Sequence, residues 1–281
     1  MNILSIQSWV AYGHVGNAAA AFPMQRLGHE VWALNTVQFS NHPGYGQWTG
    51  QVFTGDAIHD LMRGIVDLGV LPRCNGILSG YMGTADIGVA VLDAVAAVKA
   101  TNPRALYCCD PVIGDVGRGI FVQPGIPEMI RDKVVPRADI ITPNHFELEY
   151  LSGRTVQSDS DLAAALDALH ERGPKTILVT SFQGEATLKD SVDLVVSESG
   201  KRWRVRTPHL PISINGAGDA IAALFFVHRL AGDPAQALSR AASSIYGVLK
   251  LTVAGGHREI ALIEGQEEFV RPTELFAAVR L

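Results

Sequence analysis

The segment Asn215-Gly-Ala-Gly-Asp219 combines small residues with a carboxylate, and an apolar, helix-forming stretch follows it directly. The small residues let the backbone turn tightly and direct its N–H groups toward one point. That point is the N-terminus of the helix, whose dipole and free amides favour an anion such as a phosphate. Asp219 lies beside it in the first helical turn. Helices also begin this way for structural reasons alone, so a glycine turn followed by a favourable helix-start aspartate remains the alternative.

A second candidate is the segment Thr142-Pro-Asn-His-Phe-Glu147, which follows an apolar, strand-like run and begins a helix. Asn144 and Glu147 are three positions apart and therefore share one face of the first helical turn. Their oxygens suit the hydration shell of a magnesium ion. The alternative is a capping box, in which Asn144 caps the helix and Glu147 returns a hydrogen bond to the backbone.

A third, acidic segment covers residues 110–115 and follows another apolar run. Asp110 is placed to bind a cation or to order water, and its alternative role is to start a turn before Pro111. Each of the three segments has a structural explanation when taken alone. Together, at the ends of strands predicted for one sheet, they favour a shared site that handles both anions and cations.

The elements that must position these segments alternate along the chain, which predicts an α/β fold with a mostly parallel central sheet and helices on both faces. Strands are predicted at 3–6, 30–36, 76–79, 105–109, 139–142 and 176–180, with three short antiparallel strands at 186–188, 194–197 and 203–206. Helices are predicted at 16–26, 57–67, 86–99, 127–134, 144–151, 161–170, 219–230, 234–251 and 272–279. Because ligands bind beyond the carboxyl ends of parallel strands, we expect the three segments at one edge of the sheet.

Composition limits the function. The chain has 281 residues, 47% of them hydrophobic, which excludes a disordered protein and allows one domain over residues 1–281 with a large core. A net charge of −5 without a basic stripe argues against a nucleic-acid partner. No P-loop or zinc pattern is present, and Gly13–Gly16 predicts only a tight turn before a helix. Three cysteines, no leader-like segment and no membrane-length apolar run favour a cytoplasmic protein without a membrane partner.

With these motifs in place, the sequence resembles the pyridoxal (vitamin B6) kinases, a family within the ribokinase-like superfamily of small-molecule kinases. The resemblance extends from about residue 2 to beyond Asp219, and several separate motifs agree in order. Besides Asn215–Asp219 and Thr142–Glu147, the matching segments are Ser5–Ser8, Tyr12–Asn17, Asn35–His42, Leu78–Tyr81, Cys109–Asp115, Ala138–Asn144 and Val179–Ser181. The implied fold is a three-layer α/β/α sandwich of ribokinase type with a short lid loop.

The resemblance implies that Asp219 is the general base that takes the proton of the 5′-hydroxymethyl group of the vitamin. The helix dipole is expected to keep this carboxylate ionised at neutral pH. Three amides would stabilise the transferring phosphate, those of Gly216, Ala217 and Gly218. Asp110, Thr142 and Glu147 would hold magnesium, and ATP would further contact Asp115, Asn144, Thr180, Ser181 and Asn215.

The resemblance also implies a pocket for the B6 vitamer, in which Ser8 bonds the pyridine ring. The walls of this pocket would be Phe39, His42, Pro43, Gly44 and Tyr81. Residues 115–121 would form a glycine-rich lid over the nucleotide. The family further implies a monovalent cation, such as K⁺, and a homodimer.

The most direct reading is an ATP-dependent pyridoxal kinase that makes pyridoxal 5′-phosphate from the salvaged vitamin, with pyridoxine and pyridoxamine as further substrates. Two alternatives remain open. One keeps the fold and mechanism but changes the alcohol, to a hydroxymethylpyrimidine or a sugar. The other is a B6-binding protein without catalysis, which the presence of both Asp219 and Glu147 disfavours.

Overall fold

Apolar segments pair into a ten-stranded sheet in the computed structural model, which describes residues 1–281. Its order is β12-β11-β10-β9-β8-β5-β4-β1-β2-β3, and the strands from β9 to β2 in this order run parallel. The strands are β1 (Asn2–Tyr12), β2 (Glu30–Asn41), β3 (Gly50–Val52), β4 (Cys74–Ser79), β5 (Leu106–Cys109), β8 (Ile140–Ile141), β9 (Thr176–Phe182), β10 (Ser191–Glu198), β11 (Lys201–Pro208) and β12 (Val279–Arg280). A separate hairpin joins β6 (Gly114–Asp115) to β7 (Gly119–Ile120).

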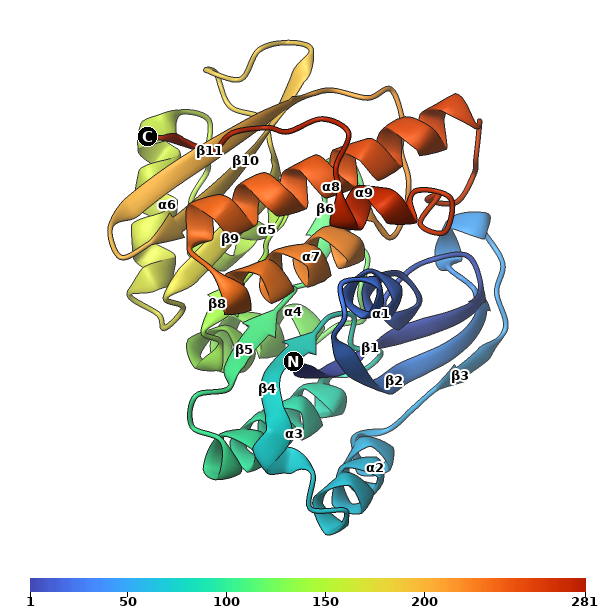
Figure 1. The fold of residues 1–281 in the computed structure, drawn as a ribbon. Helices are drawn as coiled ribbons and strands as arrows, with labels where there is room; N and C mark the ends of the chain where they lie inside the picture. Colours follow the sequence, from blue (N-terminus) through green and yellow to red (C-terminus); the bar gives the residue numbers. More distant parts are fainter.

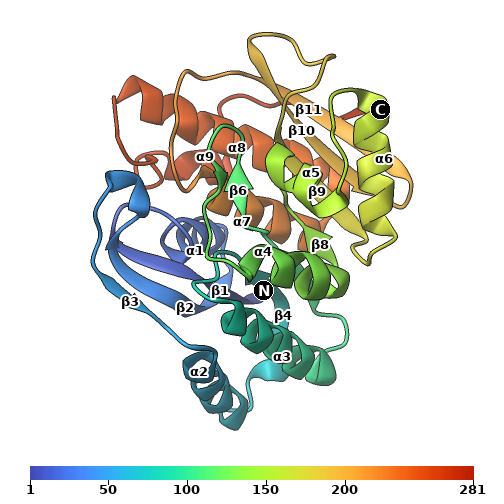
Figure 2. The ribbon, with the colours of Figure 1, turned by 180° about the vertical axis from the view of Figure 1, so that it is seen from behind.

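Helices cover both faces of this sheet, as the sequence predicts. Figure 1 shows one layer in front, made of α1 (Asn17–Arg26), α7 (Ala217–Ala231), α8 (Pro234–Ala254) and α9 (Gln266–Val270). Figure 2 shows the opposite layer, made of α2 (Gly55–Asp67), α3 (Ala85–Thr101), α4 (Ile126–Met129), α5 (His145–Ser152) and α6 (Asp159–His170). The three-layer α/β/α arrangement is therefore confirmed.

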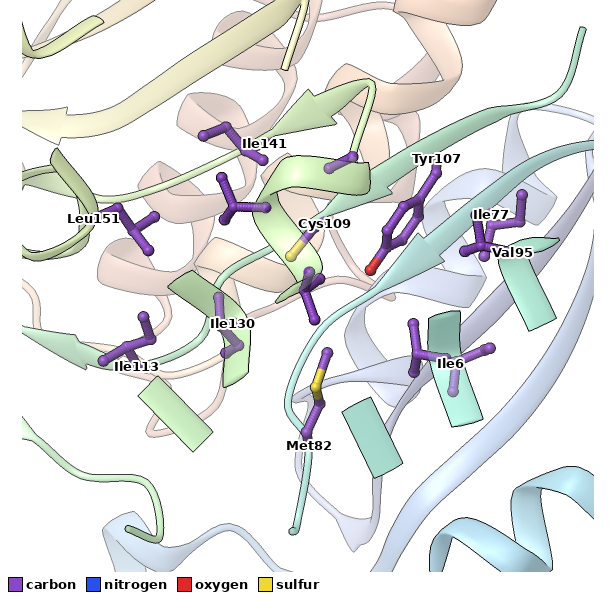
Figure 3. Packing of buried hydrophobic residues seen from close by; sticks show 14 of the residues in the cluster. Ile6, Ile77, Met82, Val95, Tyr107, Cys109, Ile113, Ile130, Ile141 and Leu151 are labelled. Atoms are coloured by element: carbon purple, nitrogen blue, oxygen red, sulfur yellow. The ribbon is translucent and has the colours of Figure 1, made fainter. Parts of the chain in front are cut away.

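The central strands are apolar on both faces because each face packs against helices. Neighbouring residues on one strand consequently enter different cores: Ile77 and Cys109 belong to the core under α2–α6, whereas Leu78 and Cys108 belong to the core under α1, α7 and α8. Figure 3 shows part of the first of these cores, including Tyr107 and Cys109. These two cores fix the strands and therefore fix where each strand ends.

Two predicted elements are wrong. Residues 186–188 form a turn in the loop between β9 and β10, closed by a hydrogen bond from Thr187 N to Gly184 O. Residues 272–279 are not helical. Side chains of α8 bind the backbone of this segment instead, since Ser239 donates to the carbonyl of Phe276 and Ser243 accepts from its amide. Val279 then pairs with β11.

The remaining predicted elements are present, and most strands are longer than predicted. The predicted helix at 127–134 is α4 followed by a π-helical turn, Ile130–Val134. No helix combines the length and the apolar character needed to cross a membrane.

Candidate active site

The turn before α7 is pressed against the turn between β1 and α1. Gly216 is the N-cap of α7 and has φ +86°, a conformation that favours glycine. A Cβ atom at this position would lie 1.8 Å from the carbonyl oxygen of His14. Only glycine fits this contact, and the start of α7 therefore lies against the turn that follows β1.

Asp219 lies in the first turn of α7, and the amide of Gly16, in the turn between β1 and α1, is close enough to lower the pKa of its carboxyl group. Burial raises the pKa of Asp219 to about 6, and the amides of Gly16 and of Asp219 itself oppose this rise. We expected the helix dipole to keep this carboxylate ionised, and burial is the largest influence on its pKa. The group is nevertheless ionised at neutral pH, in a form that accepts a proton.

Asp110 and Thr142 follow the ends of two neighbouring strands, β5 and β8. The hydroxyl of Thr142 donates to Oδ1 of Asp110 over 2.9 Å, and both side chains are buried. Burial and the nearby charges of Glu147 and Asp219 raise the pKa of Asp110 well above its ordinary value. No salt bridge joins Asp110, Glu147 or Asp219 to a basic side chain, so this cluster of three carboxylates lacks a counter-charge from the protein.

Asn144 and Glu147 form the capping box that was the alternative interpretation of their spacing. Glu147 Oε2 accepts from the amide of Asn144 at 3.0 Å, and Oε1 accepts from the amide of Ile113 at 2.9 Å. The side-chain amide of Asn144 in turn donates to the carbonyl of Gly114. Burial raises the pKa of Glu147 to about 8, against the effect of these amides. The capping box thus fastens the acidic loop, residues 110–115, to the start of α5.

A cleft of about 940 Å³ opens beside this cluster. Its polar side includes Thr180, Ser181 and Asp115, and the start of α7 contributes Ala217 and Gly218. The opposite wall is apolar, with Ile212, Ile214, Ile221, Ile245 and Leu249. An apolar slot beside helix-terminal amides is suited to a flat base carrying a phosphate chain.

The β6–β7 hairpin forms the predicted lid segment at the rim of this site. Its tip is exposed and contains Gly117 and Gly119, both with positive φ. Arg118 reaches from the tip to Oδ1 of Asn215, at 3.5 Å, and stacks over the ring of Phe121. The hairpin is therefore in contact with the turn that precedes α7.

The residues predicted to bind the acceptor alcohol lie on, or shortly after, three adjacent strands, β4, β1 and β2. Ser8 lies on β1 and is buried beside Gly16, where a Cβ atom would come within 2.2 Å of the serine Oγ. Tyr81 follows β4, and Phe39 lies on β2. His42 directly follows β2 and is buried, and a 3₁₀ turn that includes Pro43 and Gly44 comes after it.

Two residues of this site have no role in the sequence analysis. The amide of Gly16 lowers the pKa of Asp219; the glycine turn 13–16 was the available signal, but it indicated only a tight turn. Glu259 contacts both the β1–α1 turn and His42 from a loop after α8. A lone glutamate about 40 residues beyond Asp219 carries no motif, so the sequence gives no indication of this contact.

Comparisons with known proteins agree with this geometry. Residues 73–261 match the family model described as phosphomethylpyrimidine kinase. The pyridoxal kinase of Granulibacter bethesdensis is 61% identical over 99% of this chain and 99% of its own length. The pyridoxal kinase of Deinococcus radiodurans is 52% identical over 100% of this chain and 96% of its own length. A solved structure of pyridoxal kinase from Leishmania donovani, in complex with ADP and pyridoxamine, matches with a TM-score of 0.93 at 29% identity, over 100% of this chain and 99% of that one.

Proposed function

The chain belongs to the family of pyridoxal kinases, and from this premise we infer that it transfers the γ-phosphate of ATP to the 5′-hydroxymethyl group of pyridoxal. Pyridoxine and pyridoxamine are included as acceptors. The observation that carries this conclusion is the near full-length identity of 61% to a pyridoxal kinase. The turn Asn215–Asp219, which lies between the nucleotide cleft and the three strand ends, is consistent with it.

We propose that Asp219 is the catalytic base. A primary alcohol is a weak nucleophile, and a carboxylate within hydrogen-bond reach of its proton assists the attack. The pKa of about 6 supports this role, because the group is ionised at neutral pH yet basic enough to accept a proton. The amide of Gly16 favours the ionised carboxylate, and the amides of Gly216, Ala217 and Gly218 stabilise the charge on the transferring phosphate.

Magnesium is part of this proposal, and the residues fit an ion that is held by one or two carboxylates together with water and the ATP phosphates, because no three acidic, histidine or cysteine side chains converge into a metal site made of protein groups alone. Asp110, Glu147 and Asp219 are acidic, close together and without a basic partner, a set that a hard divalent cation would neutralise. Asp110 and Thr142 would hold the ion, and Glu147, whose oxygens already accept backbone amides, would act through its hydration shell. When bound, the ion neutralises charge on the ATP phosphates. The family resemblance also suggests K⁺ as a monovalent cation.

We propose that the strand ends of β1, β2 and β4 hold the vitamer. Ser8 bonds the ring, and Phe39, His42 and Tyr81 enclose it, with Pro43 and Gly44 closing the pocket from the 3₁₀ turn. On the nucleotide side, Thr180, Ser181, Asp115, Asn144 and Asn215 contact ATP. Four of these five residues support the proposal by position, since the first three line the cleft and Asn215 precedes the start of α7.

A substrate panel tests the function. Purified protein with ATP and Mg²⁺ should release ADP with pyridoxal, pyridoxine and pyridoxamine, and not with ribose. Hydroxymethylpyrimidine belongs in the panel, because the matching family model is described as a phosphomethylpyrimidine kinase. Preference for that alcohol would change the substrate while keeping the mechanism. Vitamer binding without ADP release would instead indicate the binding-protein alternative.

The same proposal includes the cellular location, the domain organisation and the oligomeric state of the enzyme. Three free, buried cysteines are compatible with a reducing, cytoplasmic location. One sheet shared by both cores supports a single domain over residues 1–281. The homodimer rests on the family resemblance alone, and the molar mass in solution tests it.

A further inference from the structure

Glu259 joins two segments of the active site that are far apart in the sequence. Its Oε1 accepts hydrogen bonds from Nε2 of His42 at 2.9 Å and from the hydroxyl of Tyr45 at 2.6 Å. Its Oε2 accepts from the amide of His14 at 3.0 Å. Gly13 leaves the space for this contact, because a Cβ atom there would lie 2.5 Å from Oε2. One carboxylate thus links the β1–α1 turn, which carries Gly16, to the loop that follows β2.

This carboxylate determines which nitrogen of His42 carries a proton. Burial acts to raise the pKa of Glu259, but the hydrogen bonds from Tyr45, His14 and His42 outweigh burial and lower it. The group is therefore ionised at neutral pH, and an ionised carboxylate only accepts hydrogen bonds. Nε2 of His42 must then be the donor, which leaves Nδ1 as the atom available to a ligand.

Nδ1 of His42 is buried and has no hydrogen-bond partner in the protein. A buried polar atom without a partner is costly and calls for an explanation. A Cβ atom at Gly44 would lie 2.8 Å from both this Nδ1 and the side-chain amide nitrogen of Asn215. Nδ1 and the side-chain amide of Asn215 therefore lie on the same side of Gly44, and Asn215 directly precedes the turn at the start of α7. Arg118 contacts Oδ1 of Asn215, so the side-chain NH₂ group of Asn215 is the part that lies near Nδ1 of His42. Because this NH₂ group is a hydrogen-bond donor, it favours an unprotonated Nδ1.

We propose that Glu259 is a positioning residue for the acceptor alcohol: it holds His42 in the Nε2-protonated form, so that Nδ1 accepts a hydrogen bond from a hydroxyl of the substrate. Tyr45 and Arg258 complete the support, since the guanidinium of Arg258 stacks 3.9 Å from the centre of the Tyr45 ring. This inference rests on the proposed vitamer pocket. It adds to that pocket a specific acceptor atom and the carboxylate that sets its protonation state.

The first test uses the wild-type protein and ¹⁵N NMR of its histidine rings, with the His42 signals assigned from His42→Gln. The proposal predicts a protonated Nε2 and an unprotonated Nδ1. Pyridoxal should shift the Nδ1 resonance, whereas ADP alone should not. A protonated Nδ1 in the free protein, or an Nδ1 resonance that pyridoxal leaves unchanged, would overturn the proposal. This measurement does not require any Glu259 variant to fold.

The second test is kinetic. In Glu259→Gln an amide NH₂ replaces one carboxylate oxygen, so either His42 or the amide of His14 loses its acceptor. We expect the KM for pyridoxal to rise about 10- to 100-fold, as for a lost hydrogen bond to a buried group. The KM for ATP should stay within about twofold of the wild-type value. Glu259→Asp, which keeps the charge, should recover part of this loss. Glu264→Gln, the same change at an exposed position of the same loop, is the control and should match the wild type.

The double variant Glu259→Gln/His42→Gln separates positioning from folding. If Glu259 acts through His42, the double variant should have the same KM for pyridoxal as His42→Gln alone. Additive losses, or equal rises in KM for pyridoxal and ATP, would show a merely structural role and contradict the proposal. Turnover of pyridoxal by the wild type with an unchanged KM in Glu259→Gln would reject this inference while leaving the proposed function intact.

Discussion

At the scale of single residues, the central feature is a carboxylate whose pKa is raised by its surroundings. Asp219 is partly withdrawn from solvent at the start of α7, and the amide of Gly16 is one of the groups that keep it ionised at neutral pH. The same environment that makes the ion costly also makes it a better base. Its titration should therefore be visible in both activity and stability.

The pH dependence of the rate follows from this pKa. The wild-type kcat/KM for pyridoxal should fall as the pH decreases through about 6, by about tenfold per pH unit below it, because the base becomes protonated. Rates measured from pH 5 to 8 with saturating Mg²⁺ and ATP provide the test. A rate that is constant across this range would contradict the assignment of Asp219.

The variant Asp219→Asn, which lacks the base, should have a more stable fold than the wild type at neutral pH. Because the pKa is higher in the folded state, the folded protein binds more protons between pH 4 and 6, and its free energy of unfolding falls as the pH rises through that window. Asparagine removes this cost. We expect a gain of about 1–2 kcal/mol at pH 7 and none below pH 4. Thermal unfolding at both pH values measures it, and a loss of stability at pH 7 would contradict the account.

At the scale of elements, the lid hairpin β6–β7 connects the acidic loop to the turn before α7. Its exposed tip and its contact between Arg118 and Asn215 place it where a bound nucleotide would meet it. We expect ATP with Mg²⁺ to slow tryptic cleavage after Arg118, because an ordered hairpin is a poor protease substrate. Cleavage after Lys201, the exposed first residue of β11 beside the β10–β11 turn, serves as the internal control. Equal rates at Arg118 with and without nucleotide would reject the lid role.

The elements also show how far sequence reasoning extends. Helices with clear start signals, such as α5 with its capping box, are predicted within one or two residues. Strand ends are underestimated, because β1 and β2 continue past their apolar cores to pair with one another. The predicted C-terminal helix fails because serines of α8 bind the backbone of that segment, a tertiary contact that local propensity does not contain.

At the site, the sequence predicts the residues that follow a strand or begin a helix. These residues belong to recognisable motifs, and their positions lie at the edge of the sheet where ligands bind. In the structure Thr142 donates a hydrogen bond to Asp110, and the charge of Glu147 raises the pKa of Asp110, while the shared metal-binding role of the three residues stays a prediction. Glu259 and Gly16 could not be assigned, because their roles depend on how three distant turns pack against each other. Contacts of this kind arise only from the assembled fold.

At the scale of the whole molecule, both halves of the chain meet at one edge of the sheet. Strands β1, β2 and β4 carry the predicted vitamer residues, and β5, β8, β9 and α7 carry those for phosphate and nucleotide. The cluster Asp110, Glu147 and Asp219 lies where the halves meet and has no basic partner. A divalent cation bound there would stabilise the folded protein as a whole.

Removal of metal tests this point. EDTA should abolish ADP release, and Mg²⁺ should restore it. Mg²⁺ together with ADP should raise the melting temperature above that with ADP alone, since a ligand that binds only the folded state stabilises it. In Asp110→Asn this additional rise should shrink. A melting temperature that does not respond to Mg²⁺ would contradict a metal site at this cluster.

The most direct measurement of the central claim is the formation of pyridoxal 5′-phosphate by the wild type and by Asp219→Asn, with pyridoxal, ATP and Mg²⁺ at pH 7.5. The account predicts product from the wild type and a rate about 10²- to 10⁴-fold lower in the variant, with ATP affinity nearly unchanged. Product formation by Asp219→Asn at the wild-type rate would show that Asp219 is not the base. No pyridoxal 5′-phosphate from the wild type would contradict the proposed function itself.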